Sequence, residues 1–110
     1  MELIKQFTIA FAGSEVGFII DSVTDQIVWT SIGKKKIKGK ENFAEEVKKM
    51  QGEKAMELAL DQILSHGKQG AANGTLKMQN GKRYAFSDFY VFQDAKGTKI
   101  KSITSYVIEI

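Results

Sequence analysis

Apolar side chains recur at helical spacing through the first part of the chain. In residues 3–11 they fall at intervals of three and four positions, so that Phe7 and Phe11 share one face of an amphipathic helix. Gly13 is well placed to end this helix, and Ser14 is expected to cap a short second helix rich in apolar residues. The pattern predicts two helices packed as a hairpin.

A strand and a third helix are expected next. Residues 27–32 (IVWTSI) are β-branched and aromatic and are too few for a helix of normal length, which is typical of a strand. After a lysine-rich turn, apolar residues recur at helical spacing from Phe43 to Met50, and Gly52 follows as a stop signal. This spacing predicts a helix near residues 41–51.

In the second half of the chain the apolar period changes to two. Residues 54–66 alternate, with Leu64 and His66 expected on the same, inward side of a long half-buried strand. Three more strands are predicted at residues 70–78, 83–92 and 99–108. The dipeptide Asn80-Gly81 between the first two of these is a strong signal for a tight hairpin turn.

These elements predict an α+β fold for one domain that spans residues 1–110. The order is helix, helix, strand, helix and then four strands, with no linker, repeat or proline among them. Long strands joined by tight turns pair in antiparallel fashion. The economical arrangement is therefore a curved, mostly antiparallel sheet wrapped around the N-terminal helices.

Composition restricts the chemistry. No cysteine is present, which excludes a disulfide framework, a thiolate nucleophile and a cysteine zinc site, and agrees with a reducing cytoplasm. A single histidine cannot assemble a multi-histidine metal site, so neither a metal nor another cofactor is expected. The N-terminal residues lack a continuous apolar stretch, so neither a signal peptide nor a membrane partner is predicted.

The positive charge does not indicate nucleic acid as a partner. The net charge is +3, but of the 16 basic residues only Arg83 is an arginine, the residue suited to bidentate contacts with phosphate or guanine. The lysine run between residues 34 and 40 has no aromatic residue interleaved for base stacking. It is interpreted as a solvated turn.

Three segments carry a resemblance to a known family. They are FAGSEVGFIIDSVTDQIVWTSIG near the start, the stretch from Gly33 to Gly39, and YAFSDFYVFQDAKGTKIKSITSYVIEI at the end. In order and spacing they resemble the nuclear transport factor 2-like superfamily, in particular its SnoaL-like branch, over nearly the whole chain. The resemblance implies a cystatin-like cone of curved sheet closed by helices, and a homodimer formed through the sheet.

Ketosteroid isomerases are the best-understood enzymes of that superfamily, and their catalytic residues are only partly matched. They use an aspartate base together with a tyrosine and a protonated aspartate as oxyanion donors. The resemblance places Thr30 at the base and Phe7 at the tyrosine, and leaves only Asp88 at the acidic donor. Threonine is a poor base near neutral pH, so this chemistry is disfavoured. Arg83 is likewise not evidently placed for the arginine of the superfamily's epoxide hydrolases.

Asp88 is the most informative residue for function. It lies in an aromatic strand between Phe86 and Tyr90, where an unpaired carboxylate is costly. We interpret it as a pocket carboxyl with a raised pKa; the alternative is a carboxylate satisfied by a neighbouring hydroxyl or amide, or turned to solvent. His66 is the second candidate for proton transfer or ligand contact, with a structural or solvent-facing role as its alternative.

Strand alternation assigns side chains to two faces of the sheet. The residues expected to bind a ligand are Phe7, Phe11, Thr30, His66, Phe86, Asp88, Tyr90 and Ser105. The opposite face carries Phe89, Val91 and Tyr106, an apolar surface of a kind usually covered by a partner. These three residues are predicted to form a homodimer interface.

Three functions remain open on this evidence. The first is a dimeric domain that binds a small, mostly apolar molecule in the cone with Asp88 as its polar anchor. The second is an isomerase, cyclase or dehydratase of a hydrophobic, steroid- or polyketide-like substrate, with Asp88 and His66 moving protons. The third is a non-catalytic protein-interaction module whose cone is filled by side chains. A cavity of about 300 Å³ or more is expected for the first two.

Overall fold

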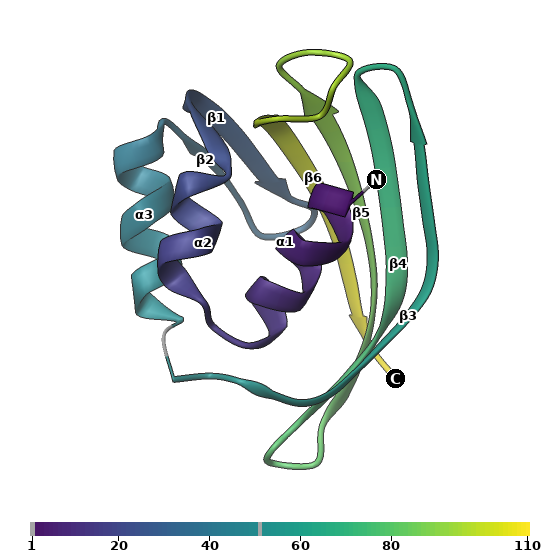
Figure 1. Ribbon diagram of the computed structural model, residues 1–110. Helices are drawn as coiled ribbons and strands as arrows, with labels where there is room; N and C mark the ends of the chain where they lie inside the picture. The colour runs from purple at the N-terminus through teal and green to yellow at the C-terminus, as the bar shows by residue number, and fades with distance from the viewer. Residues whose placement is uncertain (1, 51) are drawn as a thin grey trace.

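Three helices and six strands make up the described part of the protein, residues 2–50 and 52–110 of a computed structural model (Figure 1). In chain order they are α1 (Glu2–Ala12), α2 (Val16–Asp21), β1 (Val23–Ser31), β2 (Lys35–Lys38), α3 (Lys40–Lys49), β3 (Ala55–His66), β4 (Gln69–Met78), β5 (Arg83–Phe92) and β6 (Ile100–Glu109). The predicted α+β fold is confirmed, with one additional strand, β2.

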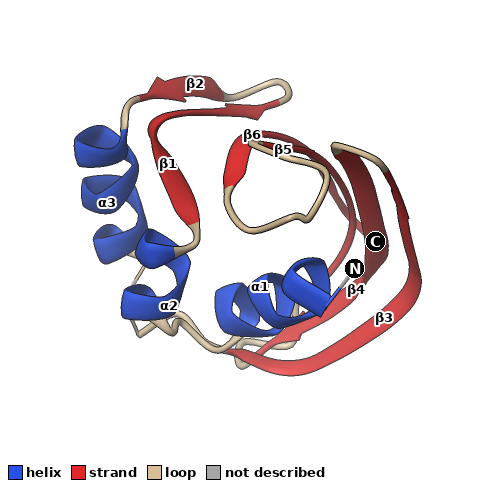
Figure 2. Cartoon of the chain, turned by 45° about the horizontal axis from the view of Figure 1, so that its top comes forward, coloured by secondary structure: helices blue, strands red, loops and turns tan. Residues whose placement is uncertain are grey.

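The six strands form one curved sheet that does not close on itself. Its order is β2-β1-β6-β5-β4-β3, and every neighbouring pair is antiparallel except β1 and β6, which run parallel. Figure 2 shows the sheet curling around α1, while α3 packs beside β1 and β2. The concave face of the sheet and α1 therefore enclose the interior of the cone.

One face of each longer helix builds the core. Helix α1 buries Ile4 and Phe7, and α3 buries Phe43 and Val47, in each case at the spacing of one helical turn. Strand residues complete this core: Val23, Ile27, Ala72, Tyr90, Phe92, Ile100 and Ile103. Each large apolar side chain buried in this way contributes about 1.5–3 kcal/mol to the free energy of unfolding.

The pairing of β3 with β4 is interrupted by a β-bulge. The register of β3 shifts between Leu60 and Gln62, which leaves Asp61 as the extra residue of a β-bulge. Gly74 lies opposite Leu60 in β4, and a Cβ at this glycine would collide with the carbonyl oxygen of Ala59. The bulge and the missing side chain together allow the two strands to curve around α1.

The link between α1 and α2 differs from the prediction. Ser14, expected to cap α2, instead adopts a left-handed φ of 56° after the end of α1. The Glu15 N–H then donates to the carbonyl of Ala10 at 2.9 Å, which is typical of a helix C-terminus of the Schellman type. Glu15 consequently occupies the N-cap position of α2, and the Ser14 hydroxyl donates to the carbonyl of Met50 at 3.3 Å. The cap prediction was wrong because α1 uses Ser14 for its own termination.

The lysine-rich segment was predicted as a solvated turn; four of its lysines are exposed, but Lys35–Lys38 form a strand, which was not predicted. Lys35–Lys38 forms β2, which pairs with the end of β1 at one edge of the sheet. Lysines on an edge strand discourage pairing with a second sheet, which explains their number here. Lys35 also forms an ion pair with Glu46 of α3 at 2.7 Å. The predicted third helix matches α3, and its predicted end at residue 51 lies outside the described residues.

Within residues 2–50 and 52–110, no helix combines the length and the apolar character needed to span a bilayer.

Candidate functional site

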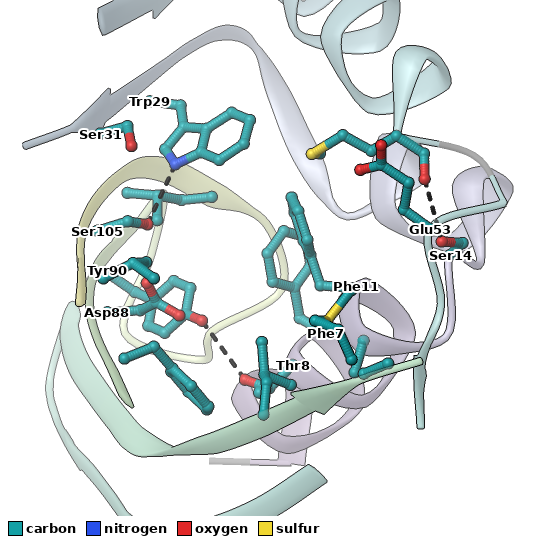
Figure 3. Close-up of a pocket in the computed structure, with 18 residues that line it drawn as sticks. Phe7, Thr8, Phe11, Ser14, Trp29, Ser31, Glu53, Asp88, Tyr90 and Ser105 are labelled. Atoms are coloured by element: carbon teal, nitrogen blue, oxygen red, sulfur yellow. Dashed lines mark hydrogen bonds between the residues drawn. The ribbon is translucent and has the colours of Figure 1, made fainter. Parts of the chain in front are cut away.

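A pocket with a cavity of about 240 Å³ lies between α1 and the concave face of the sheet. Its walls are mostly apolar, and Figure 3 shows Asp88, Tyr90 and Ser105 grouped at one side and Glu53 at the other. Of the lining residues, Glu53 and Val107 are exposed. The mouth of the pocket therefore lies where the segment before β3 approaches the end of β6.

Six of the eight residues predicted to bind a ligand line this pocket. They are Phe7, Phe11, Phe86, Asp88, Tyr90 and Ser105. The first two lie one helical turn apart on the face of α1 that meets the sheet, and the next three occupy alternate positions of β5. Ser105 on β6 is the register partner of Asp88, which brings their side chains together.

Thr30 does not line the pocket, which corrects its predicted position. Its neighbours Trp29 and Ser31 both do. Successive side chains of a strand point to opposite faces, so Thr30 lies on the convex face, where its register partner is Thr104 of β6. The position expected to correspond to the isomerase base therefore contributes nothing to the interior of the cone.

His66 also lies outside the pocket, because of the bulge at Asp61. Simple alternation predicted that His66 points into the cone, but one extra residue moves every later side chain of β3 to the other face. Ile63 pairs with the buried Ala72, and His66 is exposed in a shallow groove of the convex face. Asp88 and His66 are therefore not brought together.

Asp88 is a carboxyl withdrawn from water into an apolar pocket. Burial raises the pKa of Asp88 from 3.8 to about 6, because the ionised form loses its hydration. Hydrogen bonds from the Ser105 and Tyr90 hydroxyls act in the opposite direction, since each favours the carboxylate. Burial, followed by the nearby carboxyl, raises the pKa of Tyr90 above its usual range. Asp88 can thus change its protonation near neutral pH, while Tyr90 remains a neutral phenol.

Two hydrogen-bonded side-chain pairs lie next to this carboxyl (Figure 3). Trp29 Nε1 donates to Ser105 Oγ at 3.1 Å, which leaves the hydroxyl proton of Ser105 free for Asp88. On the other side, Thr8 Oγ1 donates to a backbone carbonyl of α1 at 2.8 Å and lies 3.5 Å from the Tyr90 hydroxyl. Because the proton of Thr8 is committed to the backbone, the Tyr90 proton points either to Thr8 or to the Asp88 carboxylate.

Aromatic rings form a continuous wall beside these polar groups. The ring centroids are 6.0 Å apart for Tyr90 and Phe7, 5.5 Å for Phe7 and Phe11, and 5.5 Å for Phe11 and Trp29. Tilted and edge-to-face contacts of this kind contribute about 0.5–1.5 kcal/mol beyond simple burial. The wall is therefore a well-packed surface along which an apolar ligand can lie.

Several lining residues were missed from the sequence. Trp29, Thr8, Ser31 and Glu53 were not among the residues predicted to bind a ligand. Trp29 and Ser31 lie two and four residues after the fully buried Ile27 in the same strand. Alternate residues of a strand share a face, so this spacing predicts that both side chains point inward. Thr8 follows Phe7 on α1, and Glu53 belongs to a connecting segment without periodicity, so no pattern identifies either of them.

The convex face of the sheet carries exposed apolar side chains. Phe89 is 50% exposed and Tyr106 is 47% exposed, and their rings meet edge to face with centroids 5.9 Å apart. Val91 lies two residues along the same strand, and Leu64 of β3 lines the same shallow groove. All three residues predicted for a dimer interface therefore lie on the face opposite Asp88.

Solved structures with the same architecture are known, whereas no protein-family model and no curated protein matches the sequence. An NTF2-like protein of unknown function from Cytophaga hutchinsonii superimposes with a TM-score of 0.76 over 97% of each chain, at 24% sequence identity. The chain adopts the nuclear transport factor 2-like fold. The predicted cone fold is confirmed.

Two further NTF2-like structures come from proteins with assigned families. A SnoaL-like family protein from Agrobacterium tumefaciens covers 98% of this chain and 99% of its own, with a TM-score of 0.74 and 13% identity. An LEH-like epoxide hydrolase from M. tuberculosis covers 98% and 81%, with a TM-score of 0.75 and 21% identity. At these identities the likeness establishes the NTF2-like fold and not the activity.

The chemistry available in this NTF2-like cone centres on one carboxyl. Asp88 can donate a hydrogen bond when protonated and accept several when ionised. In the described part of the chain, no group of three or more acidic or histidine side chains is arranged to hold a metal ion. At its inner side the pocket therefore offers acid–base chemistry at one carboxyl, with hydroxyl groups around it and an apolar wall beside it.

Proposed function

We propose that this protein binds a small, mostly apolar molecule in the cone, with Asp88 as its polar anchor. The observation that carries the proposal is a carboxyl held among hydroxyl groups inside an apolar pocket. A buried carboxyl weakens the fold when it ionises, and such groups concentrate at functional sites. The cavity of about 240 Å³ is smaller than the cavity of about 300 Å³ or more that was expected for a ligand-binding function, so the proposal is limited to a ligand below drug size.

An enzymatic function is the second candidate, and the pKa of Asp88 favours it. A value of about 6 lies close to neutral pH, where a general acid or base works best. The enzyme would be an isomerase, cyclase or dehydratase that acts on a hydrophobic substrate. Proton transfer would rest on Asp88 alone, because His66 lies on the other face of the sheet.

The side chain of Trp29 gives a direct test of binding. It is the sole tryptophan of the chain, and it lines the pocket and bonds to Ser105. Propylbenzene and phenethyl alcohol are titrated into the protein while tryptophan emission and binding heat are recorded. Both probes should change the emission and bind with one-to-one stoichiometry.

A pocket-filling variant makes the test specific. Ala12 lines the pocket and Ala95 lies in an exposed turn, so Ala12→Phe should weaken binding at least about tenfold while Ala95→Phe leaves it unchanged. If neither probe binds the wild-type protein, the cone is filled as in an interaction module and the proposal is wrong. Conversion of a bound compound by the wild type but not by Asp88→Asn would favour the enzyme.

We also infer that a second copy of the chain covers the convex face. Phe89, Tyr106 and Leu64 expose large apolar surfaces there, and monomeric proteins rarely leave such a patch uncovered. The β2 edge of the sheet is less suited to pairing, because this edge strand is lysine-rich. Face-to-face packing of two sheets through Phe89, Val91 and Tyr106 is therefore the proposed interface.

A further inference from the structure

The charged side chains that line the pocket are all acidic. Asp88 lies at its inner side and Glu53 at its mouth (Figure 3). Among the described residues, none of the lysine or arginine side chains lines the pocket, and neither does His66. This is the reverse of the net charge of the chain, which is +3. An anionic ligand would meet two carboxyls and no cation, whereas a cationic ligand would meet two counter-charges.

The uncharged polar groups around Asp88 can act as acceptors. Ser105 Oγ accepts from Trp29 Nε1 at 3.1 Å and keeps a second lone pair, and the Tyr90 oxygen has two. With the carboxylate, these oxygens form a cluster of acceptors at one side of an otherwise apolar cavity. A primary ammonium group carries three donors and no acceptor, which matches this cluster.

The aromatic wall suits the same ligand. The rings from Tyr90 through Phe7 and Phe11 to Trp29 lie along the cavity next to Asp88. Aromatic faces attract organic cations, most strongly where water is excluded. A ligand with a cationic head and an apolar body can therefore satisfy both parts of the pocket at once.

We propose that the ligand is a small primary amine with an apolar body, bound as its ammonium ion, with the head group on Asp88 and the body along the aromatic wall. This inference rests on the proposed ligand-binding function and specifies the chemical class of the ligand. The small cavity restricts the body to the size of one substituted ring. Glu53 at the mouth adds long-range attraction for the cation.

Binding of an amine is coupled to the ionisation of Asp88. The ammonium ion requires the carboxylate, and with a pKa of about 6 only about one site in ten is ionised at about pH 5, against nearly all at about pH 7.5. Apparent affinity scales with that fraction, so it should fall about tenfold on acidification. Glu53 and Tyr90 are the other titratable groups that line the pocket, and burial keeps Tyr90 neutral over this range.

The experiment compares four probes of similar size by calorimetry: phenethylamine, phenethyl alcohol, propylbenzene and phenylacetate. At about pH 7.5 the amine should bind at least about tenfold more tightly than either neutral probe, and phenylacetate should bind most weakly. The amine should lose about tenfold in affinity at about pH 5, while propylbenzene changes little. The Asp88→Asn variant should weaken the amine about a hundredfold and alter propylbenzene less than about threefold.

Asp25→Asn is the matched control, because it removes the same charge from an exposed position of β1 that does not line the pocket. It should leave all four affinities unchanged. If the alcohol binds as tightly as the amine, or if the amine binds better in acid, the amine assignment is wrong while the ligand-binding function stands. If none of the four probes binds, both are wrong. The pH profile needs no variant, so it decides the question even if Asp88→Asn folds poorly.

Discussion

The two faces of the sheet are built from the same strands, yet each carries a side chain that is more usual on the other face: a polar one inside and a large apolar one outside. On the concave face, Asp88 places a carboxyl inside an apolar pocket. One residue later, on the convex face, Phe89 leaves half of an aromatic side chain in solvent. Polar residues usually lie outside and large apolar ones inside. Two adjacent reversals in one strand point to two separate requirements, a ligand on one side and a partner on the other.

The largest expected effect comes from the curvature that separates the two faces. At Gly74 a methyl group would collide with the backbone carbonyl of Ala59, which cannot move aside as a flexible side chain can. Gly74→Ala should therefore lower the free energy of unfolding by about 3 kcal/mol, measured by urea denaturation. Gly17 in α2 has open space around it, so Gly17→Ala should instead add up to about 1 kcal/mol. Equal effects of the two substitutions would contradict this account of the curvature.

The convex face can be tested separately from the pocket. Phe89→Lys places a charge in the centre of the proposed interface, and it should weaken dimerisation about a hundredfold in sedimentation equilibrium. Phe18 on α2 is also exposed, at 40%, but it lies away from this face. Phe18→Lys should leave the dimer intact. A wild-type protein that stays monomeric at high concentration would rule out the proposed interface.

The concave face predicts a pH dependence of stability. The pKa of Asp88 is raised from 3.8 in the unfolded chain to about 6 in the folded protein, so the folded state holds the proton more tightly. The stabilisation that this bound proton adds to the free energy of unfolding is fully present below about pH 4. It is lost as the pH rises through 6. Relative to Asp88→Asn, the wild type should therefore lose about 2 kcal/mol in unfolding free energy between about pH 4 and pH 8.

Urea titrations of both proteins at the two pH values measure this difference. Asp25→Asn serves again as the control, since Asp25 is exposed on β1 and its substitution should leave the pH dependence of the wild type unchanged. Parallel pH profiles for the wild type and Asp88→Asn would show that Asp88 is ionised equally easily in the folded and unfolded states. The interpretation of Asp88 as a buried, proton-holding group would then be wrong.

The sequence predicted the concave side of β5 well and that of β3 poorly, for a physical reason. The register of β4, β5 and β6 is unbroken around Asp88, so simple alternation placed Asp88, Tyr90 and Ser105 on one face. In β3 the bulge at Asp61 reverses the alternation. No residue type marks that bulge within β3 itself, and the glycine that accommodates the close approach of the two strands, Gly74, lies in the neighbouring strand.

Other parts of the candidate site depended on contacts that no local pattern encodes. The resemblance to isomerases placed Thr30 at a catalytic position, although the buried Ile27 sets a parity that points Thr30 outward. Glu53 reaches the pocket from a connecting segment, and its role depends on how α3 and β3 are positioned in space. The fold class and the chain order of the long strands were therefore predictable, whereas β2 was missed and the composition of the pocket was predictable only along regular strands.

The smallest expected effect tests the bulge itself. His66 is exposed on the convex side, so His66→Ala should change ligand affinity less than twofold and the free energy of unfolding by no more than about 0.5 kcal/mol. Ile63 provides the contrast, because the bulge turns it toward the core opposite Ala72, where Ile63→Ala should cost about 2 kcal/mol. Without the bulge the two residues would exchange faces. If His66→Ala lowered ligand affinity and Ile63→Ala left the free energy of unfolding unchanged, the bulge would be wrong and His66 would line the pocket. A two-residue proton relay of His66 and Asp88 would then again be a candidate mechanism.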